Sequence, residues 1–271
     1  MQEIAIRGLL FALLGAVSGT TSGLFGIGGG LLIVPGLALL FARMGLPDEM
    51  VMHLAAGTSL SIMVCTATSS VWAHHRHAHV LWPVFARVLP GVVVGTVGGA
   101  LIDHWVNGDV IGFLFGLLLV AVSIRMVFDL RSGSRQRALP RAGVQTAFGV
   151  AMGLPSGLLG IGGGGLSIPF LTHFGVHPRQ VAGTSASFTL PVAVMGTISF
   201  ALLGWRASTV PFATGYVYWP TFLLVAPFTV LTAPLGAWLT HRLPTRIMRR
   251  LFAGMLFVLA FHMLWAYRTA I

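Results

Sequence analysis

The sequence predicts an all-α, polytopic membrane protein. Only 8% of its 271 residues are charged and 56% are hydrophobic, whereas a soluble globular chain carries about 25% charged residues. The mean hydropathy of +0.89 agrees with this composition. So few charges cannot cover a water-exposed surface, which excludes a soluble enzyme. Because Cys65 is the only cysteine, a disulfide-stabilised scaffold is excluded as well.

The charged residues are unevenly distributed. All 16 basic residues are arginine, and no acidic residue follows Asp129. A net charge of +10 would indicate nucleic-acid binding in a soluble protein. Here the arginines separate apolar runs, where we expect them to face anionic lipid headgroups. We therefore expect membrane lipid, and no nucleic acid, as a partner.

Long apolar stretches account for most of the chain. A helix needs about 20 apolar residues to cross a bilayer core of about 30 Å. Stretches 8–42 and 143–172 are interrupted, since each has two short apolar pieces on either side of a glycine cluster. The remaining stretches are continuous, and we expect each to form one transmembrane helix. These are 54–72, 84–102, 110–128, 181–203, 215–239 and 251–267.

The two interrupted stretches open two related halves of the chain. Ser22–Gly30 recurs 134 residues later as Ser156–Gly164. The Ala-Gly-Thr-Ser segment that follows recurs with an offset of 126, and the Pro, Gly and His at 90, 99 and 104 recur with an offset of 137. Ordered matches of this kind indicate a duplication. We expect two membrane repeats, 1–130 and 142–271, joined by an Arg-rich linker, 131–141.

The arginines indicate that the two repeats have opposite orientations. If each interrupted stretch crossed the membrane once, the linker arginines and the arginines of 242–250 would face opposite sides, against the positive-inside rule. If each stretch enters and returns, twelve arginines share one side. The four on the other side are then Arg7, Arg43, Arg206 and Arg268.

This topology describes two inverted repeats in a membrane. Each repeat is an interrupted helix pair, either re-entrant or a short hairpin, plus three transmembrane helices. The linker is then cytoplasmic and both termini are periplasmic or extracellular. Inverted repeats with interrupted helices are typical of transporters, whose binding site lies near the midplane where the interruptions meet.

The glycine clusters predict an anion-binding backbone. Each glycine inside a helix costs up to about 1 kcal/mol, and backbone that leaves a helix at membrane depth must line a cavity or be buried in protein. N–H groups at the start of the following helix favour a negative charge. The alternative is close helix packing through small residues. The candidate residues are Gly26, Gly28, Gly29, Gly30, Gly160, Gly162, Gly163 and Gly164.

Hydroxyl side chains open the next helix of each half. Their O–H groups can donate to an oxyanion, or they can bond to carbonyls of their own helix, and the sequence leaves both readings open. The candidates are Thr58, Ser59 and Ser61 in the first half and Thr184, Ser185 and Ser187 in the second.

Titratable groups inside the expected spans are scarce. No carboxylate falls within any of them, so we expect no ion coupling through a buried acid. His262 and Arg125 align at the 137-residue offset and are candidates for a proton or anion relay, the alternatives being a packed histidine and a snorkelling arginine. The histidines of 74–79 resemble a metal tract, but we expect a solvated loop there. We expect no metal and no cofactor.

The duplicated Gly-Leu-Phe-Gly-Ile-Gly-Gly-Gly (23–30) and Gly-Leu-Leu-Gly-Ile-Gly-Gly-Gly (157–164), each followed by Pro and then Ala-Gly-Thr-Ser, resemble the TauE/SafE family. This family is also called the sulfite exporter or toluene-sulfonate uptake permease family, and the resemblance covers essentially the whole chain. It implies transport of sulfite or a small organosulfonate anion across a bacterial inner (plasma) membrane, with both termini periplasmic. It also implies that the glycine and hydroxyl positions above are the binding residues.

Three other functions stay open at this point. An anion channel would use the same pore chemistry, and a carrier for a non-sulfur anion would need the same donors. A more remote alternative is an intramembrane enzyme or an assembly factor, for which Cys65 and His262 are the only tempting pair. Nothing in their spacing brings those two residues together, so we expect no enzyme. The sequence is also compatible with a homodimer.

Overall fold

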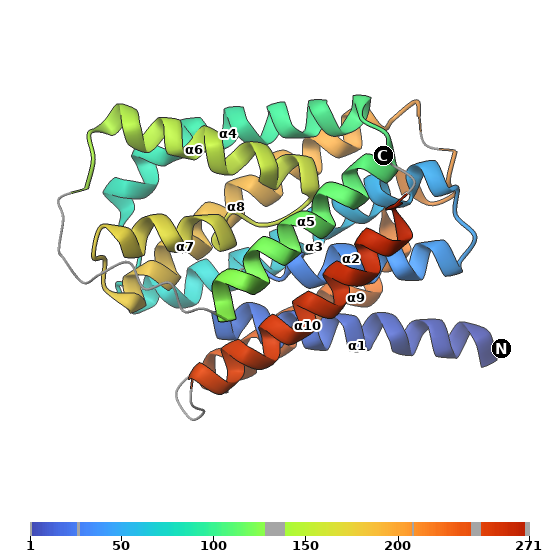
Figure 1. The fold of residues 1–271 in the computed structure, drawn as a ribbon, viewed down its shortest axis with the longest axis horizontal. Coiled ribbons are helices and arrows are strands. Elements are labelled where there is room, and N and C mark those ends of the chain that lie inside the picture. The colour runs from blue at the N-terminus through green and yellow to red at the C-terminus, as the bar shows by residue number, and fades with distance from the viewer. Residues whose placement is uncertain (1, 26–27, 128–138, 208, 240–244, 269–271) are drawn as a thin grey trace.

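The computed structural model describes residues 2–25, 28–127, 139–207, 209–239 and 245–268. Ten helices and one antiparallel ribbon lie in these ranges (Figure 1). The helices are α1 (Gln2–Phe25), α2 (Gly30–Arg43), α3 (Asp48–Arg76), α4 (Trp82–Trp105), α5 (Gly108–Val127), α6 (Ala142–Leu159), α7 (Gly164–His173), α8 (Pro178–Leu203), α9 (Trp219–Leu239) and α10 (Thr245–Ala266). The ribbon pairs β1 (Ala213–Thr214) with β2 (Val217–Tyr218).

The predicted helical membrane architecture is confirmed, but two of the expected spans differ. Over 251–267 the described chain forms a shorter apolar helix, Arg250–Ala266 within α10, which is not among the candidate membrane spans. Seven helices are long and apolar enough to cross a membrane, namely α1, α3, α4, α5, α6, α8 and α9. The helix expected over 215–239 begins instead at Trp219, because the preceding residues form the ribbon. Gly215, with φ +59°, makes the tight turn between β1 and β2. Most of the predicted linker 131–141 lies outside the described residues.

Each interrupted stretch forms a long helix followed by a short one that turns back (Figure 1). At 1.5 Å per residue, α2 and α7 are about 21 and 15 Å long, roughly half to two thirds of a bilayer core. Their partners α1 and α6 are long enough to cross it. The first member of each pair is therefore longer than the short apolar piece that we expected.

Local sequence explains where several helices begin and end. Asp48 and Glu49 lie in the first turn of α3, where carboxylates favour the helix dipole. Proline occupies the first turn of α4 and α8, where its missing N–H is not needed. Gly45 and Gly175, with φ of +72° and +73°, follow the ends of α2 and α7. Glycine adopts this left-handed conformation without steric cost.

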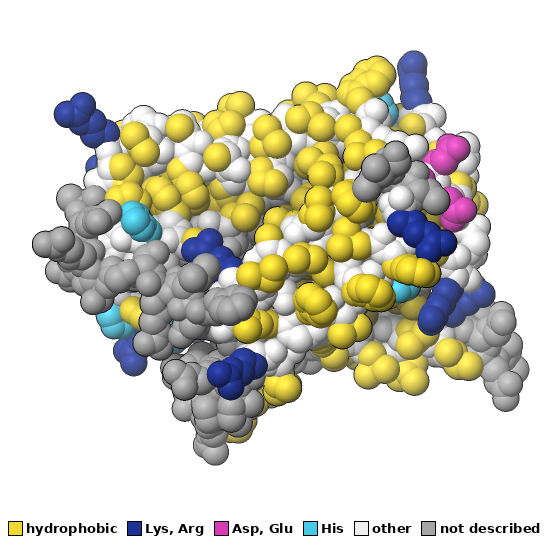
Figure 2. Space-filling model, viewed as in Figure 1, with side chains coloured by type: hydrophobic (Ala, Val, Ile, Leu, Met, Phe, Trp, Pro, Cys, Tyr) yellow, Lys and Arg dark blue, Asp and Glu magenta, His cyan; other side chains and the backbone are white. Residues whose placement is uncertain are grey.

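The outer surface suits a lipid environment. Hydrophobic side chains cover much of the face in Figure 2. Every tryptophan is exposed, up to 83% at Trp105, and lies near a helix end, as expected of residues at a membrane interface. They are Trp72, Trp82, Trp105, Trp205, Trp219, Trp238 and Trp265.

The helices alternate between two ends of the molecule (Figure 1). We call the end where α1 begins and α10 ends the terminal end, and the end where α5 ends and α6 begins the linker end. Helices α3 and α8 pack against each other, and α3 is buried along most of its length. Helix α1 packs along α9, and α6 packs along α4. The two halves of the chain therefore exchange their first helices.

Glycines permit the close contact between α4 and α6. A Cβ atom on Gly95 would lie 2.5 Å from the carbonyl oxygen of Val150, and one on Gly153 would lie 2.6 Å from that of Val92. Gly91 and Gly99, one turn to either side of Gly95, also meet the backbone of α6. Small residues at four-residue spacing allow helix backbones to approach closely in membranes.

Candidate functional site

The two glycine interruptions meet in the interior. A Cβ atom on Gly30 would lie 3.0 Å from Cα of Ile161 and 3.2 Å from the carbonyl oxygen of Gly160. The same atom would lie 3.1 Å from the sulfur of Met63, on α3. Segments that are about 130 residues apart in the sequence are thus in contact, and both are buried.

The backbone at these interruptions adopts conformations that favour glycine. Gly28, Gly29 and Gly160 have φ of +83°, +81° and +67°. A side chain there would be strained, and on Gly160 it would also collide with the backbone of Ala56. The carbonyl of Gly29 accepts hydrogen bonds from the N–H groups of the first turn of α2, at 3.0 and 3.1 Å. Gly26 lies outside the described residues.

The second interruption uses a hydroxyl that sequence reasoning missed. The N–H of Gly164, the first residue of α7, donates to Oγ1 of Thr189 on α8 at 3.2 Å. The methyl group of Thr189 would lie 2.8 Å from a Cβ atom on Gly28. Thr189 therefore touches both interruptions. Gly162 and Gly163 are buried in the link between α6 and α7.

Four of the six predicted hydroxyls bond to backbone groups of the protein. Ser61 and Ser187 donate to the carbonyls of Thr58 and Thr184, each at 2.7 Å, so these two follow the helix back-bonding alternative. Oγ1 of Thr58 accepts from the N–H of Tyr218 in the ribbon at 2.9 Å. Oγ1 of Thr184 accepts from the N–H of Leu81 at 3.0 Å, in the loop between α3 and α4.

The two remaining predicted hydroxyls are fully buried. Among the described residues, Oγ of Ser59 has no hydrogen-bond partner. Oγ of Ser185 accepts from Oγ of Ser167 on α7 at 2.9 Å. Ser18 on α1 is a further buried hydroxyl without a partner in the described chain, and its carbonyl lies 3.4 Å from a Cβ atom built on Gly29. A buried hydroxyl with an unused donor is the group that an oxyanion can satisfy.

Comparison with known proteins supplies the family. The family model described as "Sulfite exporter TauE/SafE" matches residues 11–263. The chain belongs to the TauE/SafE family. It is 32% identical over 258 residues to a protein of Haemophilus influenzae named "Probable membrane transporter protein", covering 94% of this chain and 97% of that one.

Two more distant relatives carry the same kind of name. A probable membrane transporter protein of the archaeon Methanocaldococcus jannaschii is 27% identical over 259 residues, with 94% of both chains covered. One from Bacillus subtilis, YunE, is 24% identical over 257 residues, with 88% and 90% covered. This TauE/SafE protein is thus a multi-pass membrane protein whose relatives are named as transporters rather than enzymes.

The candidate relay residues of this TauE/SafE protein do not reach the interruptions. His262 on α10 and Arg125 in the last turn of α5 are both exposed on the outer surface. In the histidine tract, His74–Arg76 form the end of α3 and His77–His79 continue into the loop. Among the described residues, no group of three or more histidine, cysteine or acidic side chains could hold a metal ion.

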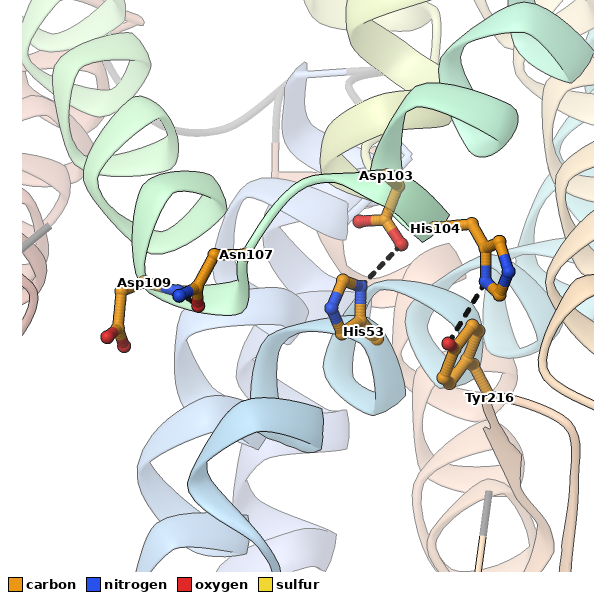
Figure 3. Close-up of polar contacts among 6 residues, drawn as sticks. All are labelled: His53, Asp103, His104, Asn107, Asp109 and Tyr216. Atoms are coloured by element: carbon orange, nitrogen blue, oxygen red, sulfur yellow. Dashed lines mark hydrogen bonds and ion pairs between the residues drawn. The ribbon is translucent and has the colours of Figure 1, made fainter. Parts of the chain in front are cut away.

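The expectation that no acid lies inside a span is wrong. Asp103 lies within α4, is completely buried, and places Oδ2 at 2.7 Å from Nδ1 of His53 on α3 (Figure 3). The apolar run ends at 102, but the helix continues to Trp105 and carries Asp103 into the interior. The signal in the sequence was an aspartate directly after the end of the expected span 84–102. Its partner, 50 residues away, could not be identified from spacing.

Two further side chains complete this polar cluster at the terminal end. Nδ1 of His104 lies 3.2 Å from the hydroxyl of Tyr216, whose ring stacks on that of His53 with centroids 5.1 Å apart. Burial, and then the Asp103 carboxylate, raise the pKa of the Tyr216 hydroxyl. His104, Trp205 and Arg206 line an open hollow of about 590 Å³ beside the cluster. We call His53, Asp103, His104 and Tyr216 the terminal-end cluster.

Proposed function

We propose that this TauE/SafE protein moves sulfite or a small organosulfonate anion across the plasma membrane, and binds it where the two glycine interruptions meet. The observation that carries the proposal is the contact between Gly30 and the Gly160–Ile161 segment. Two helix N-termini begin beside this contact, at Gly30 and Gly164. Their partial positive charges favour an anion. The hydroxyl of Ser59 on α3, which has no partner among the described residues, supplies a further hydrogen-bond donor.

Several contacts support an inverted-repeat arrangement for this transporter. Thr58 and Thr184, which are 126 residues apart, each accept a hydrogen bond from a backbone N–H group. The two donors, Tyr218 and Leu81, are 137 residues apart. These are the two offsets of the duplicated motifs. The exchange of α1 and α6 between the halves has the same symmetry. A pseudo-twofold axis in the membrane plane would relate such contacts.

The symmetry-related contacts suggest how access could alternate. At the terminal end the ribbon lies against Gly57 of α3, where an added Cβ atom would collide with the carbonyl of Tyr216. At the linker end the carbonyl of His79 would lie 2.5 Å from a Cβ atom on Gly183 of α8. The hydroxyl-bearing segments lie inside their helices and not at the helix starts that we expected, because α3 begins at Asp48 and α8 at Pro178. Each loop thus contacts one of these segments from one side of the membrane. Release of one loop at a time would open the site to one side at a time.

The orientation follows from charge. Arg43, in the last turn of α2, is at the terminal end, whereas Arg76, in the last turn of α3, Arg141 and Arg179 are at the linker end. Under the positive-inside rule the linker end is cytoplasmic, and both termini are periplasmic. The repeats are then 1–130 and 142–271.

The test is anion flux in proteoliposomes. Gly30→Ala introduces a methyl group 3.0–3.2 Å from three neighbours, so one of the interruptions must shift. Gly98→Ala on α4 is the matched control, because nothing lies within 4 Å of its added Cβ atom. We expect wild type and Gly98→Ala to exchange labelled taurine or sulfite by counterflow, and Gly30→Ala to lose most of that exchange.

Two results would overturn the proposal. Equal counterflow in Gly30→Ala and Gly98→Ala would separate the binding site from the interruptions. Flux without counterflow in the wild type would indicate a channel rather than an alternating-access carrier.

A further inference from the structure

The His53–Asp103 pair is not used by the proposed anion chemistry. His53 is 7% exposed and Asp103 is completely buried. Oδ1 of Asp103 has no hydrogen-bond partner among the described residues. Burying a carboxylate whose hydrogen bonds are incomplete is unfavourable, and a buried ion pair adds little to stability. An ionisable residue at membrane depth is therefore better explained by a function than by folding.

We propose that His53 and Asp103 together bind the proton that couples anion movement to a pH gradient. This inference rests on the proposed transport function and names its coupling ion. With one proton, on Nδ1, the pair is a neutral imidazole that donates to a carboxylate and has a net charge of −1. A second proton, taken from water and held on the imidazole or on Oδ1, makes the pair neutral overall. The pair can thus lose its net charge by gaining one proton.

The groups around the pair allow proton access from the terminal end. His104 follows Asp103 on α4 and lines the open hollow together with Arg206, which follows α8. Tyr216 faces the pair from the ribbon, stacked on His53. Glu49, one turn before His53 on α3, is exposed, and Asp109 on α5 lies apart from the pair (Figure 3). The residue that follows Asp103 in the sequence, His104, therefore lines a hollow that is open to solvent.

The pair is linked to the candidate anion site through the ribbon. The residue stacked on His53 is Tyr216, whose carbonyl packs on Gly57. Two residues later, the N–H of Tyr218 donates to Thr58, the neighbour of Ser59. A change in the charge of the pair therefore acts on the same short segment of α3 that carries the unused hydroxyl.

Only the first repeat carries such a pair. At the motif offsets of 126 and 137, the positions of His53 and Asp103 correspond to Arg179 and Thr240. Neither residue changes charge near neutral pH. One pair per chain predicts one coupled proton per cycle, bound near the terminal end.

The experiment measures two activities of the full-length protein in proteoliposomes. The first is counterflow of labelled taurine or sulfite at equal pH on both sides. The second is accumulation of the same anion under an imposed pH gradient, tested in both directions. Asp103→Asn keeps an acceptor for the N–H of His53 but cannot change charge, and Asp109→Asn is the control. We expect Asp103→Asn to retain counterflow and to lose gradient-driven accumulation by at least about fivefold, the lower range of a coupling free energy. Asp109→Asn keeps both activities.

Each contrary outcome is informative. Gradient-driven accumulation that persists in Asp103→Asn overturns the proposal, as does a wild type that exchanges anion but ignores the pH gradient or follows a sodium gradient instead. Absence of counterflow in the wild type overturns the transport function itself. If Asp103→Asn does not reach the membrane, His53→Gln, which keeps an N–H near the carboxylate, repeats the test.

Discussion

The bond between Thr58 and the ribbon gives a prediction whose magnitude follows from the structure. Thr58→Val keeps the shape of the side chain but removes the acceptor for the N–H of Tyr218, at 2.9 Å. Thr58 is completely buried, so this N–H loses its partner in the interior. An unsatisfied buried donor costs about 1–3 kcal/mol. That range corresponds to roughly a 5- to 150-fold increase in the opening equilibrium of the ribbon.

Hydrogen–deuterium exchange followed by mass spectrometry reads this equilibrium directly. Peptides that cover 213–220 should exchange faster in Thr58→Val by that factor, while peptides from the loop at 77–81 should not change. The control is Thr68→Val on the same helix, because the Thr68 hydroxyl is exposed and donates to the carbonyl of Val64 in its own helix. Unchanged protection of 213–220 in Thr58→Val would refute the idea that this hydroxyl holds the ribbon on α3.

Further predictions concern packing, pH and the outer surface. Gly95→Ala should destabilise the protein by about 1–3 kcal/mol, because overpacking forces α4 and α6 apart, whereas Gly98→Ala should not, and thermal unfolding in detergent compares the two. Burial, followed by the charges of Asp109 and Asp48, raises the pKa of Tyr267 to about 12. In the unfolded chain this phenol ionises near pH 10. The free energy of unfolding should therefore be unaffected by Tyr267 below pH 10 and should fall between pH 10 and 12. Thermal unfolding measured over a pH series should show this decline in the wild type and not in Tyr267→Phe. His262→Ala should leave counterflow unchanged, since His262 is exposed on the outer surface. A large loss of counterflow in His262→Ala would indicate that His262 takes part in transport.

Sequence reasoning was most informative where a motif is duplicated. The two glycine clusters predicted two interruptions, and helices do end at Phe25 and Leu159 and restart at Gly30 and Gly164. This worked because glycine's cost in a helix and the apolar run lengths are local properties. The close contact of α4 and α6 was not predicted, although Gly91, Gly95 and Gly99 show the required spacing, because their partner helix is not visible in one sequence.

The features that sequence reasoning missed depend on tertiary contacts. Thr58 was considered as an anion ligand or a back-bonding residue, but its partner is an N–H 160 residues away. Asp103 was counted outside a span because hydropathy changes one residue before it, while the helix continues. The ribbon has only two residues in each strand, which is too short for a pattern of alternating burial to be recognised.

The most direct test of anion binding at the interruptions is a thermal-shift panel on detergent-solubilised protein, with sulfite, sulfoacetate, taurine and an aryl sulfonate compared with matched carboxylates, phosphate and sulfate. A ligand that binds only the folded state adds about 2.7 kcal/mol at 100 times its Kd. We predict stabilisation by at least one sulfite or sulfonate ligand, reduced in Ser59→Ala and Gly30→Ala and retained in Gly98→Ala. An equal shift in all four proteins, or stabilisation by carboxylates alone, would contradict a sulfur-anion site where the two interruptions meet.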